Sequence, residues 1–409
     1  MTDLTDIRAL DAADPLAHFR DRFDLPEGVI YLDGNSLGAL PREAKKRIAD
    51  VVSREWGQDL IRSWNTNHWI EAPRRVGSKI AQLIGAKAAE VIATDSTSIN
   101  VFKALSAAID LNPDRPLILS ETGNFPTDAY MMEGLSRLTG GRVEQKLVAP
   151  TDIPSALTED VAVLLLTHTN YKSGRLHDMA ALTKAAQAKG ILVIWDLSHS
   201  AGAMPVDLNG CNVDFAVGCG YKYMNGGPGA PAFVFVAERH QNQVFPALSG
   251  WMGHANPFDF TDDYKPAAGI DRFLCGTPGI LGLAGLECGV DLMLEADMAV
   301  IRNKSLALSQ LFIDLVEANC PDVNLVSPRS PELRGSQISF AHERGYSVMQ
   351  ALIARGIIGD FRAPNVLRFG FTPLYTRFED VWIAAMALSD IIRTGEWENE
   401  KYALRAAVT

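Results

Sequence analysis

The chain has 409 residues, more than one hydrophobic core usually organises, so we expect two structural units. Its 49 acidic and 38 basic side chains give a formal net charge of −11. A negative surface repels nucleic acid and anionic membrane, and we expect neither as a partner. Residues 1–21 carry charges throughout and contain no apolar core segment, which predicts the absence of a signal peptide.

The cysteines are few, odd in number and scattered: Cys211, Cys219, Cys275, Cys288 and Cys320. No pair of them has the spacing of metal ligands, and nothing suggests a disulfide framework. We therefore expect a cytoplasmic protein without a metal site. The longest apolar runs, such as 161–166, are too short to span a bilayer and are typical of buried strands.

Short apolar runs alternate with helical patterns through the middle of the chain. The expected strands are 116–120, 161–167, 191–196, 213–218 and 232–236. The Ala-rich stretch 178–189, which stops at Gly190, predicts a helix between the second and third of these strands. Uninterrupted apolar strands separated by helices indicate an α/β fold with a mostly parallel sheet covered on both faces.

Leucines and alanines recur at helical spacing from about 282 to 318, which predicts a long helix that links the sheet to a second unit. The strands and helices expected beyond it are 337–341, 346–355, 366–371 and 378–393. We predict a large α/β domain at 41–285. Residues 286–409, joined by the N-terminal segment 1–40, are predicted to form the linking helix and a smaller α+β domain.

Ligands of open α/β sheets bind beyond the carboxyl ends of the strands, so the residues after each strand indicate the function. Strand 191–196 ends in the sequence Asp196-Leu-Ser-His199. A carboxylate there can pair with a protonated ring nitrogen, which makes a pyridinium a better electron sink, and His199 can stack on the ring or bond beside it. A helix-capping aspartate with an unrelated histidine would produce the same pattern.

Lys222 lies in the glycine-rich loop 219–229, which follows strand 213–218. A lysine nucleophile needs a neutral and partly desolvated amine, and the end of a buried strand offers that setting. A solvated surface lysine is the common alternative. Because Asp196 ends the preceding strand, the acid and the lysine together are a stronger signal of a catalytic site than either residue alone.

An anion site is expected within 91–100, where an apolar run changes to hydroxyl residues and then to a helical pattern. Backbone N–H groups at that helix start, with the hydroxyls of Thr97 and Ser98, would bind a phosphate and gain from the helix dipole. Plain capping of the helix by Asp95 or Ser96 uses the same residue types and is an equal alternative.

These motifs, in this order, resemble those of the kynureninase family within the fold-type-I class of pyridoxal-phosphate (PLP) enzymes. The segments that carry the resemblance are Tyr31–Gly38 (YLDGNSLG), Asp95–Asn100, Asn124–Asp128, Asn170–Gly174, Asp196–His199, Gly220–Lys222 and Leu367–Tyr375. The ordered set, which covers nearly the whole chain, is specific. It implies a PLP-dependent transferase fold of type I. It also implies hydrolysis of L-kynurenine, or of 3-hydroxykynurenine, to anthranilate or 3-hydroxyanthranilate and L-alanine, as in tryptophan catabolism.

For the site, the resemblance implies Lys222 as the Schiff-base lysine, Asp196 as the partner of the pyridine nitrogen, and Tyr221 or Lys222 as the donor of a proton to the substrate. Phe125 would stack on the ring, although core packing is its alternative role. The other residues expected around the ring and the phosphate are Thr97, Ser98, Asp128, Thr167, His199 and Tyr221.

Two further residues, Trp251 and Thr277, match positions that reach into the site of the neighbouring subunit in this family. The resemblance therefore implies a homodimer with shared active sites, which composition does not show.

The substrate is expected to meet four residues. Arg368 matches the arginine that clamps the substrate's α-carboxylate with its guanidinium fork, and a strand-edge ion pair is its alternative role. Ser36, Trp64 and His68 are candidates for contact with the aryl ring and the ketone. A turn serine, a packed tryptophan and a surface histidine are their alternative roles.

Other functions share the expected fold. A cysteine desulfurase needs a nucleophilic cysteine on a mobile loop near the C-terminal domain, whereas the last cysteine is Cys320 and 344–368 contains none. An aminotransferase or an aldolase-type lyase is not excluded by these residues. A non-catalytic PLP-binding regulator would add a basic DNA-binding segment, and none precedes the large domain.

Overall fold

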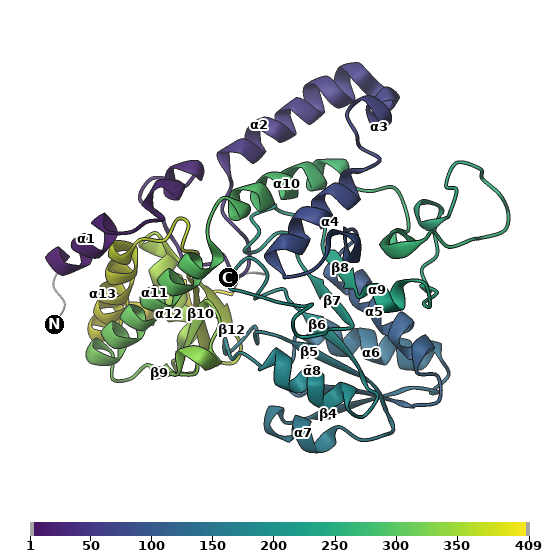
Figure 1. The fold of residues 1–409 in the computed structure, drawn as a ribbon. Helices are drawn as coiled ribbons and strands as arrows, with labels where there is room; N and C mark the ends of the chain where they lie inside the picture. The colour runs from purple at the N-terminus through teal and green to yellow at the C-terminus, as the bar shows by residue number, and fades with distance from the viewer. Residues whose placement is uncertain (1–3, 406–409) are drawn as a thin grey trace.

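A computed structural model describes residues 4–405; residues 1–3 and 406–409, at the outer ends of the two predicted terminal segments, lie outside the described residues. A seven-stranded sheet with the order β2-β8-β7-β6-β5-β3-β4 forms the centre of the larger unit (Figure 1). The strands are β2 (Val91–Ala93), β3 (Leu117–Glu121), β4 (Glu144–Val148), β5 (Val161–Thr167), β6 (Leu192–Asp196), β7 (Phe215–Gly218) and β8 (Phe233–Val236). Strands β4, β3, β5, β6 and β7 run parallel, and β8 is antiparallel to both of its neighbours. The predicted α/β class with a mostly parallel sheet is confirmed.

The sheet is buried on both faces because successive side chains of its strands enter opposite cores. In β5, Leu164 and Leu166 enter one core, and Val163 and Leu165 enter the other. The helices are α4 (Ala72–Leu83), α8 (Met179–Gln187) and α10 (Ile280–Leu294) on the first face, and α5 (Thr97–Leu111) and α6 (Pro126–Leu138) on the second. This layering leaves the ends of the strands as the open edges of the unit.

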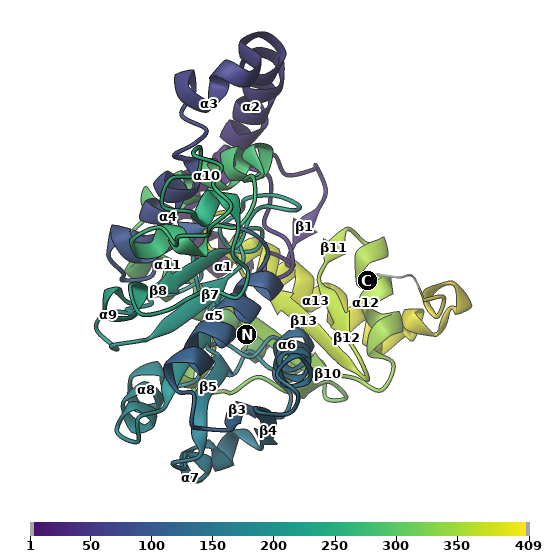
Figure 2. The ribbon, with the colours of Figure 1, turned by 90° about the vertical axis from the view of Figure 1, so that its right-hand side faces the viewer.

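A second, fully antiparallel sheet with the order β12-β13-β10-β9 forms the smaller unit (Figure 2). Its elements are α11 (Met298–Asn319), β9 (Asn324–Leu325), β10 (Gln337–Ala341), α12 (Gly345–Ala354), β12 (Asp360–Arg362), β13 (Val366–Gly370) and α13 (Phe378–Thr394). The N-terminal helix α1 (Leu4–Ala12) adds Ile7 to the same core, and β1 (Ile30–Tyr31) pairs with β11 (Ile357–Ile358). Helix α1 and strand β1 therefore pack on the smaller unit, whereas Leu16, Phe19 and Phe23, which lie between them, join the core of the larger unit.

Two helices occupy the stretch for which one long helix was predicted. Helix α10 ends at Leu294, and α11 begins at Met298 after Asp297, whose side chain accepts a hydrogen bond from the Ala299 N–H at 2.7 Å. An aspartate that caps a helix start opens a new helix and ends the preceding run. The predicted boundary between residues 285 and 286 falls inside α10, and the division at that point remains a prediction.

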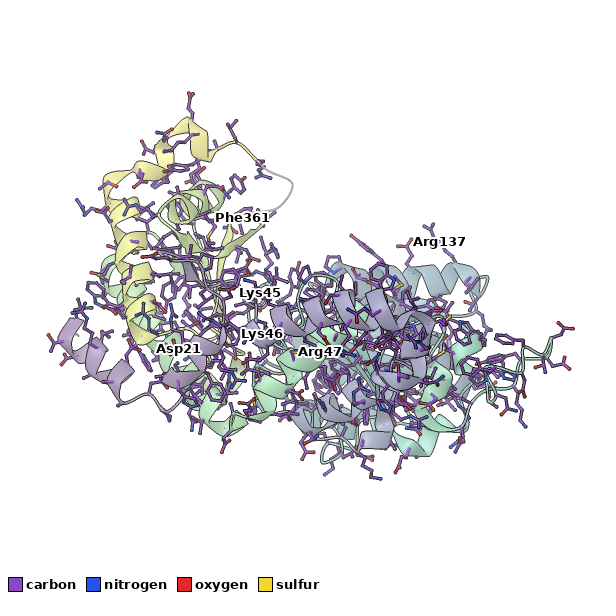
Figure 3. The ribbon with its side chains drawn as sticks, turned by 90° about the horizontal axis from the view of Figure 1, so that it is seen from above. Asp21, Lys45, Lys46, Arg47, Arg137 and Phe361 are labelled. Atoms are coloured by element: carbon purple, nitrogen blue, oxygen red, sulfur yellow. The ribbon has the colours of Figure 1, made fainter. Side chains whose placement is uncertain are left out.

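Two segments project from the larger unit (Figure 1). Helix α2 (Arg42–Asp50) continues into the π-helix η2 (Val51–Asp59) and then into α3 (Ser63–Thr66), and a long loop connects α9 (Glu238–Gln241) to α10. Seen from above, Lys45–Arg47 of α2 lie between Phe361 of the smaller unit and Arg137 of the larger one (Figure 3). Over residues 4–405, no helix has both the length and the apolar character that crossing a membrane would require.

Candidate active site

The carboxyl ends of β5, β6 and β7 meet at one edge of the large sheet. Thr167 and Asp196 are register partners at the ends of β5 and β6, and Lys222 follows β7. The pocket at this edge is lined by Ser96, Thr97, Ser98, Phe125, Thr127, Asp128, Thr167, Asp196, Ser198, His199, Tyr221 and Lys222. The sheet topology thus brings together all the residues that the sequence predicts around the ring and the phosphate of a cofactor, except Trp251 and Thr277.

The Lys222 amine points into this pocket. Its Nζ lies 3.0 Å from His199 Nε2, 5.9 Å from the centre of the Phe125 ring and 5.8 Å from that of Tyr221. Gly38 packs closely against the lysine loop. Its N–H donates to the Tyr221 carbonyl at 2.8 Å, and a side chain at this position would collide with the Lys222 carbonyl. The N-terminal signature therefore contacts the lysine loop directly.

His199 is a buried, neutral base beside the lysine. Burial, and then the charge of Lys222, hold the pKa of His199 well below its usual value. A neutral imidazole has one ring nitrogen that donates a hydrogen bond and one that accepts, and Nε2 is the ring nitrogen in contact with the Lys222 amine, at 3.0 Å. His199 therefore orients the amine without adding a second positive charge.

Asp196 lines the pocket, and within residues 4–405 only its Oδ1 oxygen has hydrogen-bond partners. Its side chain is 2% exposed, and Oδ1 accepts hydrogen bonds from the Ser198 N–H at 2.8 Å and the Ser198 hydroxyl at 2.6 Å. Burial raises the pKa of Asp196, while Ser198 and the charge of Lys222 oppose that rise. A cationic ring nitrogen at Oδ2 would stabilise the carboxylate form further.

A second buried carboxylate, Asp128, lies in a polar network under the same pocket. Its Oδ2 accepts hydrogen bonds from Asn124 Nδ2 and Thr167 Oγ1, both at 3.3 Å, and Thr167 also donates to Asn124 Oδ1. Burial, and then the charge of Asp196, raise the pKa of Asp128 well above its usual value. Neither Asn124 nor Ser198 was predicted as a site residue, although both belong to motifs that the sequence shows.

The start of α5 serves both as a capped helix end and as a candidate anion site. Ser96 caps the helix, with its hydroxyl 3.4 Å from the Ile99 N–H, whereas Asp95 binds the buried Lys103 ammonium at 2.5 Å. The Thr97 hydroxyl is buried and has no hydrogen-bond partner in the described part of the chain. Since the first turn of a helix also has N–H groups without intrahelical acceptors, a phosphate here would find several donors.

The polar groups that line the pocket fit PLP. The turn at Thr97 suits its phosphate, Oδ2 of Asp196 suits its ring nitrogen, and the Lys222 amine suits its aldehyde. Phe125, at 40% exposure, presents an aromatic face to the same pocket. The pocket therefore offers a suitable side chain for the phosphate, the ring nitrogen and the aldehyde of the cofactor.

Arg368 takes part in a buried ion pair, the alternative role that the sequence left open. Both Arg368 and Asp360 are 1% exposed; Arg368 Nε donates to Asp360 Oδ1 at 2.6 Å, and Nη2 donates to Oδ2. Ser36 donates to Asp360 at 2.7 Å and accepts from Arg368 at 3.0 Å. Arg362 binds the same carboxylate at 2.8 Å. The sequence did not single out Asp360, the centre of this cluster.

Arg368 and Ser36 lie in this cluster and do not line the pocket around Lys222, and four further predicted site residues do not line it either. Trp64 is half-buried and His68 is exposed on the projecting arm after η2. Trp251 and Thr277 are exposed in the segment between α9 and α10. All four remain predictions, and the exposure of Trp251 and Thr277 leaves both side chains accessible to another subunit.

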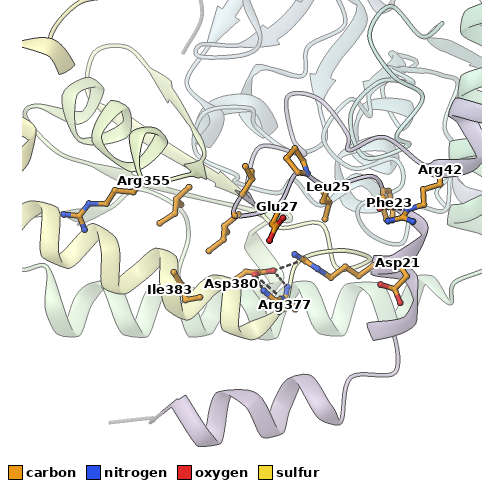
Figure 4. Close-up of a pocket in the computed structure, with 15 residues that line it drawn as sticks. Asp21, Phe23, Leu25, Glu27, Arg42, Arg355, Arg377, Asp380 and Ile383 are labelled. Carbon is orange, nitrogen blue, oxygen red and sulfur yellow. Dashed lines mark hydrogen bonds and ion pairs between the residues drawn. The ribbon is translucent and has the colours of Figure 1, made fainter.

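A cavity of about 500 Å³ lies between the N-terminal segment and the start of α13 (Figure 4). Its lining is rich in arginine, but Arg20 and Arg377 both bind Asp380, and Arg355 binds Asp390. These three arginines are already paired with carboxylates, and the cavity is separate from the pocket around Lys222.

The mostly parallel sheet carries a lysine after one strand and a carboxylate at the end of the neighbouring strand, beside a helix start that is a candidate anion site. This fold and site are those of a PLP-dependent enzyme of fold type I. Solved structures share this fold. A cysteine desulfurase from Thermococcus onnurineus NA1 matches with a TM-score of 0.78 at 19% identity, over 92% of this chain and 98% of that one. One from Escherichia coli matches with a TM-score of 0.78 at 20% identity, over 93% and 98%.

Sequence comparison is more specific. Residues 301–388 match the family described as the kynureninase C-terminal domain. Kynureninase from Burkholderia pseudomallei (strain 1106a) is 53% identical over 408 residues, which cover 98% of each chain. Kynureninase from Pseudomonas fluorescens is 51% identical over 416 residues and 100% of each chain. The chain belongs to the kynureninase family.

Proposed function

We propose that this chain is a PLP-dependent kynureninase that hydrolyses L-kynurenine to anthranilate and L-alanine. One water molecule is consumed, and the bond between the β and γ carbons of the substrate breaks. The observation that carries the proposal is the pocket in which Lys222 and Asp196 meet at adjacent strand ends, in a chain that is 53% identical to a kynureninase.

Bound PLP would supply an electron sink conjugated with the α-carbon of the substrate. Lys222 would hold PLP as a Schiff base, and Asp196 Oδ2 would accept a hydrogen bond from the protonated ring nitrogen. Phe125 would cover one face of the ring, while Thr97, Ser98 and the first turn of α5 would hold the phosphate. Asp128, Thr167 and His199 complete the ring surroundings.

Proton transfer would fall to the two residues at the end of the lysine loop. Lys222, oriented by His199 at 3.0 Å, would remove the proton from the α-carbon of the substrate. Burial, as the largest cause, raises the pKa of Tyr221 to about 12, so its phenol stays protonated at neutral pH. Tyr221, or the protonated Lys222, would then deliver a proton to the β-carbon.

Arg368 would bind the α-carboxylate of the substrate, since a guanidinium donates two parallel hydrogen bonds to a carboxylate. Ser36 lies beside it, and Trp64 and His68 are the candidates for the aryl end. Contacts at the aryl end would set the preference between kynurenine and 3-hydroxykynurenine, and 3-hydroxykynurenine is therefore the second substrate to assay.

We also propose a cytoplasmic homodimer with shared sites. Trp251 and Thr277 would complete the site of the partner subunit. The projecting segments carry exposed apolar side chains that a partner would cover, namely Trp56 (58% exposed), Ile61 (76%), Phe258 (61%) and Phe260 (76%). Apolar side chains gathered on projecting segments are typical of protein interfaces.

Cysteine desulfurase chemistry fits the chain poorly despite the shared fold. Cys320 is fully buried at the end of α11, and burial raises its pKa to about 11. A nucleophilic cysteine needs a thiolate and access to substrate, and Cys320 has neither.

The test is to incubate the purified chain with PLP and L-kynurenine, and to follow anthranilate by fluorescence and alanine by amino-acid analysis. We expect equal amounts of both products, and none from Lys222→Ala. A keto acid formed from kynurenine without anthranilate would identify an aminotransferase and overturn the proposal.

A further inference from the structure

A group of charged side chains surrounds the arginine proposed to bind the substrate. Asp360, at the centre, binds Arg368 at 2.6 Å and Arg362 at 2.8 Å, and it accepts a hydrogen bond from Ser36 at 2.7 Å. If a substrate carboxylate takes over Arg368, Asp360 therefore keeps Arg362 as its counter-ion. The cluster can release one guanidinium without leaving its own carboxylate unpaired.

Asp33 is the second carboxyl group of this cluster. Its backbone bridges to Gly370 on β13, two residues beyond Arg368, and its carbonyl accepts the Ser36 N–H at 2.9 Å. Asp33 Oδ1 is buried and has no hydrogen-bond partner in the described part of the chain. A buried carboxylate oxygen without a donor is costly in the charged form, and the neutral acid is favoured.

The groups that face Asp33 come from several elements. They are Asp360, Arg362 and Arg368 of the small sheet and the phenols of Tyr31, Tyr223 and Tyr375. Burial, and then the charge of Asp360, raise the pKa of Asp33 to about 7. The phenols stay neutral at that pH because burial raises the pKa of each of them, so Asp33 alone of this group changes charge near neutrality.

The protonation state of Asp33 sets the net charge of the cluster. With Asp33 neutral, the two arginines and Asp360 sum to +1, which one substrate carboxylate cancels. With Asp33 ionised, the sum is zero, and a bound carboxylate would leave a net negative charge in a buried site. Uncompensated buried charge is strongly unfavourable. Binding of the carboxylate should therefore favour the protonated form of Asp33.

We propose that Asp33 carries the proton that accompanies the α-carboxylate of the substrate into the site, so that the carboxylate binds Arg368 when Asp33 is neutral and dissociates more readily when Asp33 is ionised. This inference rests on the proposed function, because it takes Arg368 as the carboxylate site. Asp33 acts here through Arg368 and Asp360, without touching the reacting atoms.

The test uses the PLP-loaded protein and desaminokynurenine, the substrate analogue without its α-amino group, which contributes no amine proton of its own. Calorimetric titration at pH 8 in two buffers of different ionisation enthalpy gives the number of protons taken up. We expect uptake approaching one proton, and an affinity about fivefold weaker at pH 8 than at pH 7, since about one half of Asp33 is neutral at pH 7 and about one tenth at pH 8.

Asp33→Asn mimics the neutral acid, and we expect it to bind the analogue with equal affinity at pH 7 and pH 8 and without proton uptake. With kynurenine, its KM should lose the rise toward alkaline pH while kcat stays within about twofold of the wild type. Asp21→Asn, at an exposed aspartate of the same segment, is the control and should retain the wild-type proton uptake.

Binding by the wild type without proton uptake at pH 8 would overturn the inference, and that measurement does not depend on the folding of any variant. Unchanged proton uptake in Asp33→Asn would assign the proton to another group and overturn it as well. Failure to release anthranilate would count against the proposed function instead, and calorimetry, which needs no turnover, keeps the two outcomes apart.

Discussion

Asp196→Asn tests the role of the buried carboxylate most sharply, because the substitution keeps the shape of the side chain and reverses one hydrogen bond. Ser198 offers two donors to Oδ1, so the amide oxygen of the asparagine takes that position. The amide NH₂ group then points into the pocket. It faces the proposed ring nitrogen with a donor where the wild type has an acceptor.

The magnitude follows from two losses. A hydrogen bond to a charged group contributes about 1.5–3 kcal/mol, and a buried donor left without an acceptor costs about 1–3 kcal/mol. Their sum of about 4 kcal/mol corresponds to a roughly thousandfold lower kcat, at about 1.4 kcal/mol for each factor of ten. The loss belongs to kcat because it removes the protonated ring that receives the electrons.

The assay is anthranilate release at saturating PLP and kynurenine, with cofactor absorbance recorded on the same samples. Ser198→Ala is the matched control, because the Ser198 N–H still holds Oδ1 at 2.8 Å, and we expect its kcat to stay within about tenfold of the wild type. A kcat of Asp196→Asn within threefold of the wild type, with cofactor bound, would refute the assigned role of Asp196.

Other outcomes follow from the same geometry. Arg368→Ala should raise the KM for kynurenine about 30- to 150-fold, the equivalent of about 2–3 kcal/mol of charge-assisted hydrogen bonds, with the cofactor absorbance unchanged; an unchanged KM would remove Arg368 from the site. A mixture of Lys222→Ala and Trp251→Ala subunits, refolded together, should recover about a quarter of wild-type activity, since half the dimers are mixed and each holds one intact site. Activity no higher than that of the separate variants would contradict the shared site.

The sequence predicted the central strands well because each is an uninterrupted apolar run that is buried on both faces. The edge strand β4, Glu144–Val148, was missed because three of its first four side chains are charged or amide and the strand is largely exposed. Its pairing with β3 is what makes it a strand. The division between α10 and α11 was also missed, because the spacing of leucines and alanines suggests one continuous helix and the capping role of Asp297 was not recognised.

The pocket around Lys222 could be predicted because ligands of such sheets lie at strand ends, so order along the chain translates into proximity. The surroundings of Arg368 could not be predicted in this way. Ser36 and Asp360 are 324 positions apart in the chain, and no local pattern reports their hydrogen bond. Asp360 and Arg368 face each other across β12 and β13, which only the strand register establishes.

Borohydride reduction of the PLP-loaded protein, followed by peptide mapping by mass spectrometry, tests whether the amine of Lys222 holds the cofactor. Reduction fixes the linkage between lysine and cofactor as a stable amine. We expect one pyridoxyl-phosphate adduct, on Lys222, and none in Lys222→Ala treated alike. An adduct on another lysine, or visible cofactor absorbance that persists in the variant, would contradict this expectation.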